Sequence, residues 1–67
     1  MRTASNDLDK QQKKLLGKMK MTARNVGELA QKMGGISETE VRRLIDRARG
    51  QGAEVRNVAP KVFIYLE

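Results

Sequence analysis

The side chains best suited to binding chemistry in this sequence are basic. Three arginines form the group with the most regular spacing. Arg42, Arg43 and Arg47 lie in a segment whose apolar residues repeat at helical spacing. On a helix, the side opposite this apolar stripe is centred on Thr39, Arg43 and Asp46, and the other two arginines flank it. A guanidinium group can donate paired hydrogen bonds to phosphate oxygens or to the acceptor edge of guanine. We therefore expect this face to contact a polyanion, with Arg43 best placed for a bidentate contact.

Lysines concentrate the positive charge in the first third of the chain. The formal charge is +6, from 14 Lys and Arg against 8 Asp and Glu. Residues 1–24 hold seven basic and two acidic residues (+5), whereas residues 25–67 hold seven and six (+1). A basic balance suits a polyanionic partner, and a merely solvated lysine face is the alternative. Contacts to phosphate that position the protein without specifying a sequence are assigned to Lys10, Lys13, Lys14 and Lys18.

Residues for catalysis or metal binding are poorly represented. The chain has no cysteine and no histidine, so it lacks thiolate ligands and the commonest general base. It has no glycine-rich phosphate loop, and Glu40 is expected at a helix cap rather than in a catalytic pair. We therefore expect no enzyme activity, catalytic residue, metal or cofactor in this chain, although a fragment would leave room for a catalytic domain elsewhere.

The length allows one small domain, because 67 residues bury only roughly 60% of their unfolded surface. No apolar run approaches the ~20 residues of a membrane span, and residues 1–7 have no apolar signal core. We expect a cytoplasmic protein without a membrane partner. The last two residues, Leu66-Glu67, are typical of a cloning scar before an affinity tag, which would make the chain a domain cut from a longer protein.

Apolar spacing and caps predict three helices. The first runs from Leu8 to about residue 19 and follows a polar tail, residues 1–7, that we expect to be disordered. The second begins at the cap Asn25 and ends before Gly34-Gly35.

The third helix has the sharpest pattern. Ser37 and Glu40 form a capping box at its start. At its end we expect Gly52 to be the left-handed stop, with Gly50 as the alternative. The apolar stripe of this helix consists of Val41, Leu44, Ile45 and Ala48.

From Glu54 onward the apolar period changes to two, which predicts a short β-hairpin. Pro60 cannot donate to a strand ladder and is expected in the turn. Alternate residues of the second strand share a face: Val62, Ile64 and Leu66 on one side, Phe63 and Tyr65 on the other. A hairpin this short must lean on the helices. The predicted core consists of Leu29, Val41, Leu44, Ile45, Val55, Val62 and Ile64.

These elements predict an α+β domain over residues 8–67 with the layout of a winged helix-turn-helix, namely three helices and a C-terminal β-hairpin, the wing. The segment Val26–Ile45, with its Gly34-Gly35 turn, resembles bacterial winged helix-turn-helix domains. The continuation through residues 52–66 is similar to the N-terminal domain of biotin protein ligase repressors and to small bacterial and phage regulators. One departure is the second glycine of the turn, which usually holds a single glycine. In many winged helices, the segment before the second helix is a short strand that pairs with the wing.

The resemblance implies a DNA-binding fold, and with the arginine face it predicts binding of double-stranded DNA, for transcriptional regulation or for docking a larger protein at the nucleoid. The third helix would enter the major groove with Thr39, Arg42, Arg43 and Arg47, and the wing would reach the backbone or minor groove with Arg56, Asn57 and Lys61. The alternative is a winged-helix protein–protein interaction module, which the near-neutral charge of residues 25–67 favours. A protein partner or a homodimer is compatible with either reading.

Overall fold

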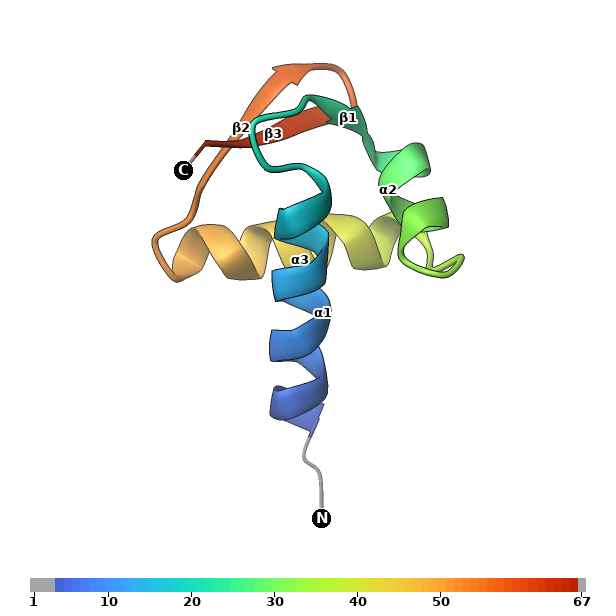
Figure 1. Cartoon of the computed structure of the whole chain (residues 1–67), viewed down its shortest axis with the longest axis vertical. Coiled ribbons are helices and arrows are strands. Elements are labelled where there is room, and N and C mark those ends of the chain that lie inside the picture. Colours follow the sequence, from blue (N-terminus) through green and yellow to red (C-terminus); the bar gives the residue numbers. More distant parts are fainter. Residues whose placement is uncertain (1–3, 67) are drawn as a thin grey trace.

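Three helices and a three-stranded antiparallel sheet follow one another along the chain (Figure 1). This computed structural model describes residues 4–66, and side chains from residue 7 onward. The elements are α1 (Ala4–Lys18), β1 (Arg24–Asn25), α2 (Val26–Lys32), α3 (Glu38–Gly50), β2 (Glu54–Ala59) and β3 (Val62–Leu66). The central strand is β3, with β1 and β2 on its two sides. This α+β arrangement is compatible with the predicted winged helix-turn-helix layout.

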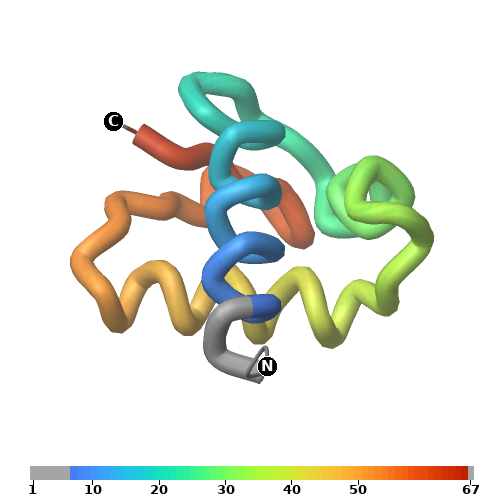
Figure 2. Tube along the Cα trace, turned by 60° about the horizontal axis from the view of Figure 1, so that its bottom comes forward, coloured from blue at the N-terminus to red at the C-terminus, as the bar shows by residue number. Residues whose placement is uncertain are grey.

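The helix α1 crosses α3, and α2 and the sheet lie together on one side of α3 (Figures 1 and 2). The short strand before α2 is present as β1, where Arg24 and Asn25 pair with Phe63 and Val62 of β3. None of the helices within residues 4–66 is long and apolar enough to cross a lipid bilayer.

The helix α1 begins at Ala4, four residues before the predicted start at Leu8. Ser, Asn and Asp at residues 5–7 are residue types favoured at helix starts, and the carboxylate of Asp7 lies in the first turn, where the helix dipole favours negative charge. The sequence of this turn has no large apolar residue, so periodicity could not reveal it. The rest of the expected tail, residues 1–3, and the final Glu67 lie outside the described residues.

The predicted caps Asn25 and Ser37 and the predicted left-handed Gly52 are confirmed. The side chain of Asn25 accepts a hydrogen bond from the Gly27 N–H (2.7 Å), and Ser37 Oγ accepts one from the Glu40 N–H (3.1 Å). At the end of α3, Gly52 has φ = +95° and is the left-handed residue, whereas Gly50 is still helical. Pro60 lies in the hairpin turn, as predicted.

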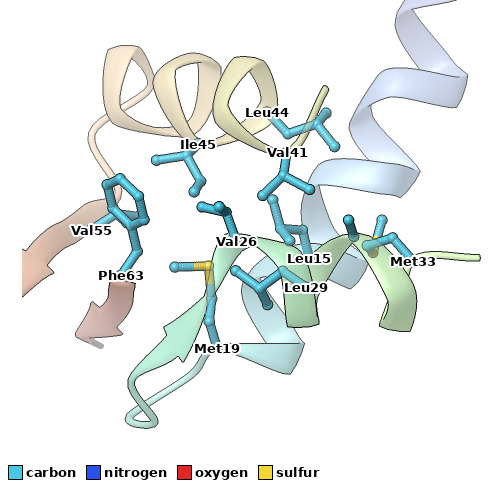
Figure 3. Close-up of a cluster of buried hydrophobic side chains, with 11 residues drawn as sticks. Leu15, Met19, Val26, Leu29, Met33, Val41, Leu44, Ile45, Val55 and Phe63 are labelled. Carbon is cyan, nitrogen blue, oxygen red and sulfur yellow. The ribbon is translucent and has the colours of Figure 1, made fainter. Parts of the chain in front are cut away.

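The core lies where all three helices meet the sheet (Figure 3). Five of the seven residues predicted to be buried are buried: Leu29, Val41, Leu44, Ile45 and Val55. Leu15 of α1 and Met19, which directly follows α1, were absent from the predicted core and complete the cluster, and both are fully buried. The core therefore depends on α1 as much as on the two helices that follow it.

The predicted inward face of β3 is wrong. Phe63 is buried with 7% of its surface exposed, and Tyr65 packs against the core, whereas Val62 and Ile64 are only half-buried. Alternation along a strand defines two faces but does not say which one meets the helices, and a shift of one residue exchanges them. The face with the two aromatic rings is turned inward, which is consistent with the large apolar area that such rings remove from water.

Candidate nucleic-acid interface

The outward face of α3 is set by the apolar stripe on its other side. Val41, Leu44 and Ile45 are buried against the rest of the core, which turns Thr39 and Arg43 away from it. Thr39, Arg42 and Arg43 are all exposed, as predicted. These three side chains are therefore free to meet a partner without any change in the packing of α3.

Arg43 forms an exposed ion pair on this face. Its side chain is 70% exposed, and its Nη1 lies 3.3 Å from Oε1 of Glu40, one helical turn earlier. Exposed pairs of this kind contribute little to stability, typically below about 1 kcal/mol. The guanidinium can therefore exchange Glu40 for another acceptor at small cost.

The hairpin borders the side of α3 that carries Glu38, Arg42 and Arg49. Arg49 Nε donates to the carbonyl oxygen of Val55 (2.9 Å), and its guanidinium lies 5.7 Å from the centre of the Phe63 ring. Lys61 Nζ lies 4.0 Å from Oε1 of Glu38. Because residues 38, 42 and 49 share a side of the helix, the structure brings Lys61 to the same edge of α3 as Arg42.

The two other predicted wing residues have different positions. Arg56 follows the buried Val55 on β2, so its side chain leaves the outer face of the sheet, where it pairs with Glu54 (2.8 Å). The Asn57 side-chain amide donates to the carbonyl oxygens of Ala59 and Val62 (2.9 and 3.1 Å) and so holds the irregular end of the hairpin.

Arg47 is not on the outward face. Its side chain is 27% exposed, its Nη2 lies 2.8 Å from Oδ1 of Asp9, and its Nη1 donates to Oε1 of Gln12 (2.7 Å). The Gln12 amide in turn donates to Oε1 of Gln51 (2.7 Å). These contacts join α1 to α3, so we assign Arg47 to the packing of the two helices.

The predicted phosphate-binding lysines all belong to α1, which packs on the core side of α3. Lys10 and Lys13 are exposed on α1. Lys14 and Lys18 line a cavity of about 430 Å³ with Lys20, Arg24 and Lys32. The last three were not singled out from the sequence, because only the fold brings the segment after α1 and the end of α2 to this place. The four-residue spacing of Lys14 and Lys18 was the one local signal available.

Carboxylates accompany the basic side chains around α3 and the hairpin. Glu40, Glu54 and Glu38 pair with Arg43, Arg56 and Lys61, and Asp46 is exposed on the outward face. This surface is therefore close to neutral, and the larger concentration of positive charge lies on α1 and at the cavity. Within residues 7–66, no group of three or more carboxylates is close enough to hold a metal ion.

Comparison with known proteins gave no match: no family model, no curated protein and no solved structure is significantly similar to the chain.

Proposed function

We propose that the chain is a winged helix-turn-helix domain that binds double-stranded DNA by placing α3 in the major groove. The observation that carries this proposal is the outward face of α3, where Thr39, Arg42 and Arg43 are exposed and have no part in the core. A helix with one face buried in a rigid scaffold and the other bearing arginine fits the width of the major groove. Regulation of transcription, or docking of a larger protein on DNA, would follow from such binding.

In this proposal Arg43 donates a bidentate pair to a guanine, because it is the most central arginine on the outward face. Arg42 and Lys61, at the edge shared with the hairpin, contact phosphates. Arg56 reaches the backbone from the outer face of the sheet, and Asn57 shapes the hairpin rather than reading a base. Arg47 and the lysines of α1 have no role in the groove.

A backbone-amide NMR titration with a short random-sequence duplex at low salt tests the proposal. We expect shifts for residues 37–47 and for the hairpin between Arg56 and Lys61, and smaller shifts for residues 62–66. Absence of shifts in α3 would overturn DNA binding through this face.

Two substitutions on the outward face should act in opposite directions. Arg43→Ala should weaken specific binding by about 1–3 kcal/mol if the side chain reads a base. Asp46→Ala should strengthen non-specific binding, because it removes a negative charge that faces the DNA phosphates. A face that is merely solvated would give no such pair of opposite effects.

A protein–protein interaction module is the second candidate, and the three exposed ion pairs around α3 and the hairpin favour it. Each pair places a carboxylate beside a basic side chain that DNA would need. Near-neutral surfaces of mixed charge suit a protein partner better than a polyanion. The same titration discriminates the two, since a protein-docking face would not respond to duplex DNA.

A further inference from the structure

A basic cavity lies between the end of α1, the segment that follows it, and α2. Its volume is about 430 Å³, within the usual range for sites that take small molecules. The lining residues are Lys14, Gly17, Lys18, Lys20, Thr22, Arg24 and Lys32. Five of these seven carry positive charge, and none of the described residues lining it is acidic. Such a lining selects for a multiply charged anion.

One cation of the cavity is held rigidly. Arg24 Nε donates to the carbonyl oxygen of Lys18 (2.6 Å), and its Nη1 pairs with the carboxylate of Glu28. These contacts fix the guanidinium between α1 and α2, and Thr22 also lines the cavity. The arginine therefore supplies a preorganised charge around which the longer lysine side chains can adjust.

Three lysines of the cavity, Lys14, Lys18 and Lys32, differ from other basic side chains of the surface in their ion pairs. Among the described residues, no carboxylate lies within 4.0 Å of Lys14, Lys18 or Lys32, although Arg43, Arg47, Arg56 and Lys61 each have one. Lys18 and Lys32 lie in the last turns of α1 and α2, where the helix dipole favours positive charge. The helix dipole does not account for Lys14, which lies one turn earlier in α1.

We propose that this cavity is a second anion site that binds closely spaced phosphate groups. Cations gathered at one concave surface repel one another and raise the local positive potential, and a polyphosphate relieves both effects. Two or three neighbouring phosphates match Lys14, Lys18 and Lys32, the three cavity lysines for which the described residues offer no carboxylate. The site does not depend on DNA binding by α3, because it lies on the opposite side of α1 from the contacts that join α1 to α3.

Sodium tripolyphosphate is the first probe, added to the full chain at constant ionic strength set with sodium chloride. We expect NMR shifts for the amides of Gly17, Lys18, Thr22 and Lys32, and none for Thr39 to Arg43. No cavity shift at saturating tripolyphosphate, or equal shifts over all basic segments, would overturn the proposal.

A matched pair of double variants separates this site from general charge attraction. Lys14→Gln with Lys18→Gln removes two cavity lysines, and Lys10→Gln with Lys13→Gln removes two from the same helix outside the cavity. The first pair should weaken tripolyphosphate binding roughly tenfold, because two exposed charge pairs together amount to about one power of ten in affinity. Equal weakening by both pairs would contradict the proposal. Lys14→Gln with Lys32→Gln repeats the test without altering Lys18, and melting curves establish that each variant is folded.

A blunt duplex of random sequence is the second probe and identifies the source of the phosphates. If it shifts the cavity amides as tripolyphosphate does, the site takes the backbone of a second nucleic-acid segment. If tripolyphosphate alone shifts them, the ligand is a small polyphosphate. Either outcome supports a phosphate site. If neither probe shifts the cavity amides, the phosphate site is overturned, whether or not the α3 amides shift. The proposed DNA binding by α3 is tested separately, by the shifts of the α3 amides.

Discussion

Arg43 and Arg47 are four residues apart on α3, yet their surroundings give them different tasks. Arg43 is 70% exposed beside Glu40, whereas Arg47 is 27% exposed and contacts Asp9 and Gln12 of α1. The sequence predicts both as groove residues, because its helical periodicity describes one helix alone. The partners of Arg47 lie 38 and 35 residues away along the chain, beyond the reach of any local pattern.

Replacing these two arginines should therefore affect stability differently. Arg47→Ala should lower the free energy of unfolding by about 1–2 kcal/mol, because it removes a charged hydrogen bond and leaves the buried Gln12 oxygen without its donor. The ion pair with Asp9 adds little to this value, because the Asp9 side chain is exposed to solvent. Arg43→Ala, the matched control, should change it by no more than about 0.5 kcal/mol. Urea unfolding of both variants provides the measurement, and equal effects would contradict the assignment of Arg47 to the α1–α3 contact.

At the scale of elements, the turn between α2 and α3 explains the second glycine. Gly34 and Gly35 both have positive φ, +89° and +85°. The Gly35 N–H donates to the carbonyl oxygen of Ala30 (2.9 Å), and the Gly34 N–H donates to that of Gln31 (3.1 Å), which closes α2. Two successive left-handed residues thus set the direction in which the chain enters α3.

Gly35→Ala should destabilise the domain by about 1–2 kcal/mol through its backbone alone, because an added Cβ would meet no atom within 4 Å. The control is Gly17→Ala in α1, where a Cβ also has open space and φ is not positive. That substitution should leave stability unchanged or raise it by up to about 1 kcal/mol. Thermal unfolding of the two variants measures the contrast, and a loss of stability in both would point to side-chain crowding instead.

The orientation of β3 gives a second element-scale prediction. Phe63→Ala should cost about 3–5 kcal/mol, because the ring is buried between the sheet and the helices. Ile64→Ala, on the half-buried outer face, should cost less, about 1–2 kcal/mol. A larger loss of unfolding free energy for Ile64→Ala than for Phe63→Ala, measured by denaturant unfolding, would instead support the predicted inward face of Val62 and Ile64.

Features of the helices and strands could be predicted from the sequence where they depend on residues close together along the chain. Caps at Asn25 and Ser37 and the left-handed Gly52 were predictable, because each involves hydrogen bonds or dihedrals within a few residues. The inward face of β3 was not, because it depends on how the whole sheet meets the helices. The early start of α1 was missed because its first turn is polar.

At the scale of the whole molecule, charge and architecture divide the surface into two regions. The edge formed by α3 and the hairpin is nearly neutral, while positive charge gathers on α1 and at the cavity. The sequence showed the excess of charge in residues 1–24, but not that α1 packs on the core side of α3. Folding therefore places the lysines that the sequence assigned to phosphate contacts on a different helix face from the arginines assigned to the groove.

The salt dependence of duplex binding can locate the surface that DNA uses. Arg42→Gln with Lys61→Gln and Lys10→Gln with Lys13→Gln both lower the formal charge from +6 to +4, so their effects through net charge are matched. If α3 and the hairpin dock on DNA, the first pair should reduce the slope of log affinity against log salt by about 1.8, since each lost phosphate contact removes about 0.9. The second pair should leave the slope nearly unchanged, because those lysines lie on α1, away from the outward face of α3. Fluorescence anisotropy at several salt concentrations measures both slopes. A larger loss with the lysine pair would move the DNA contact to α1 and overturn docking through α3.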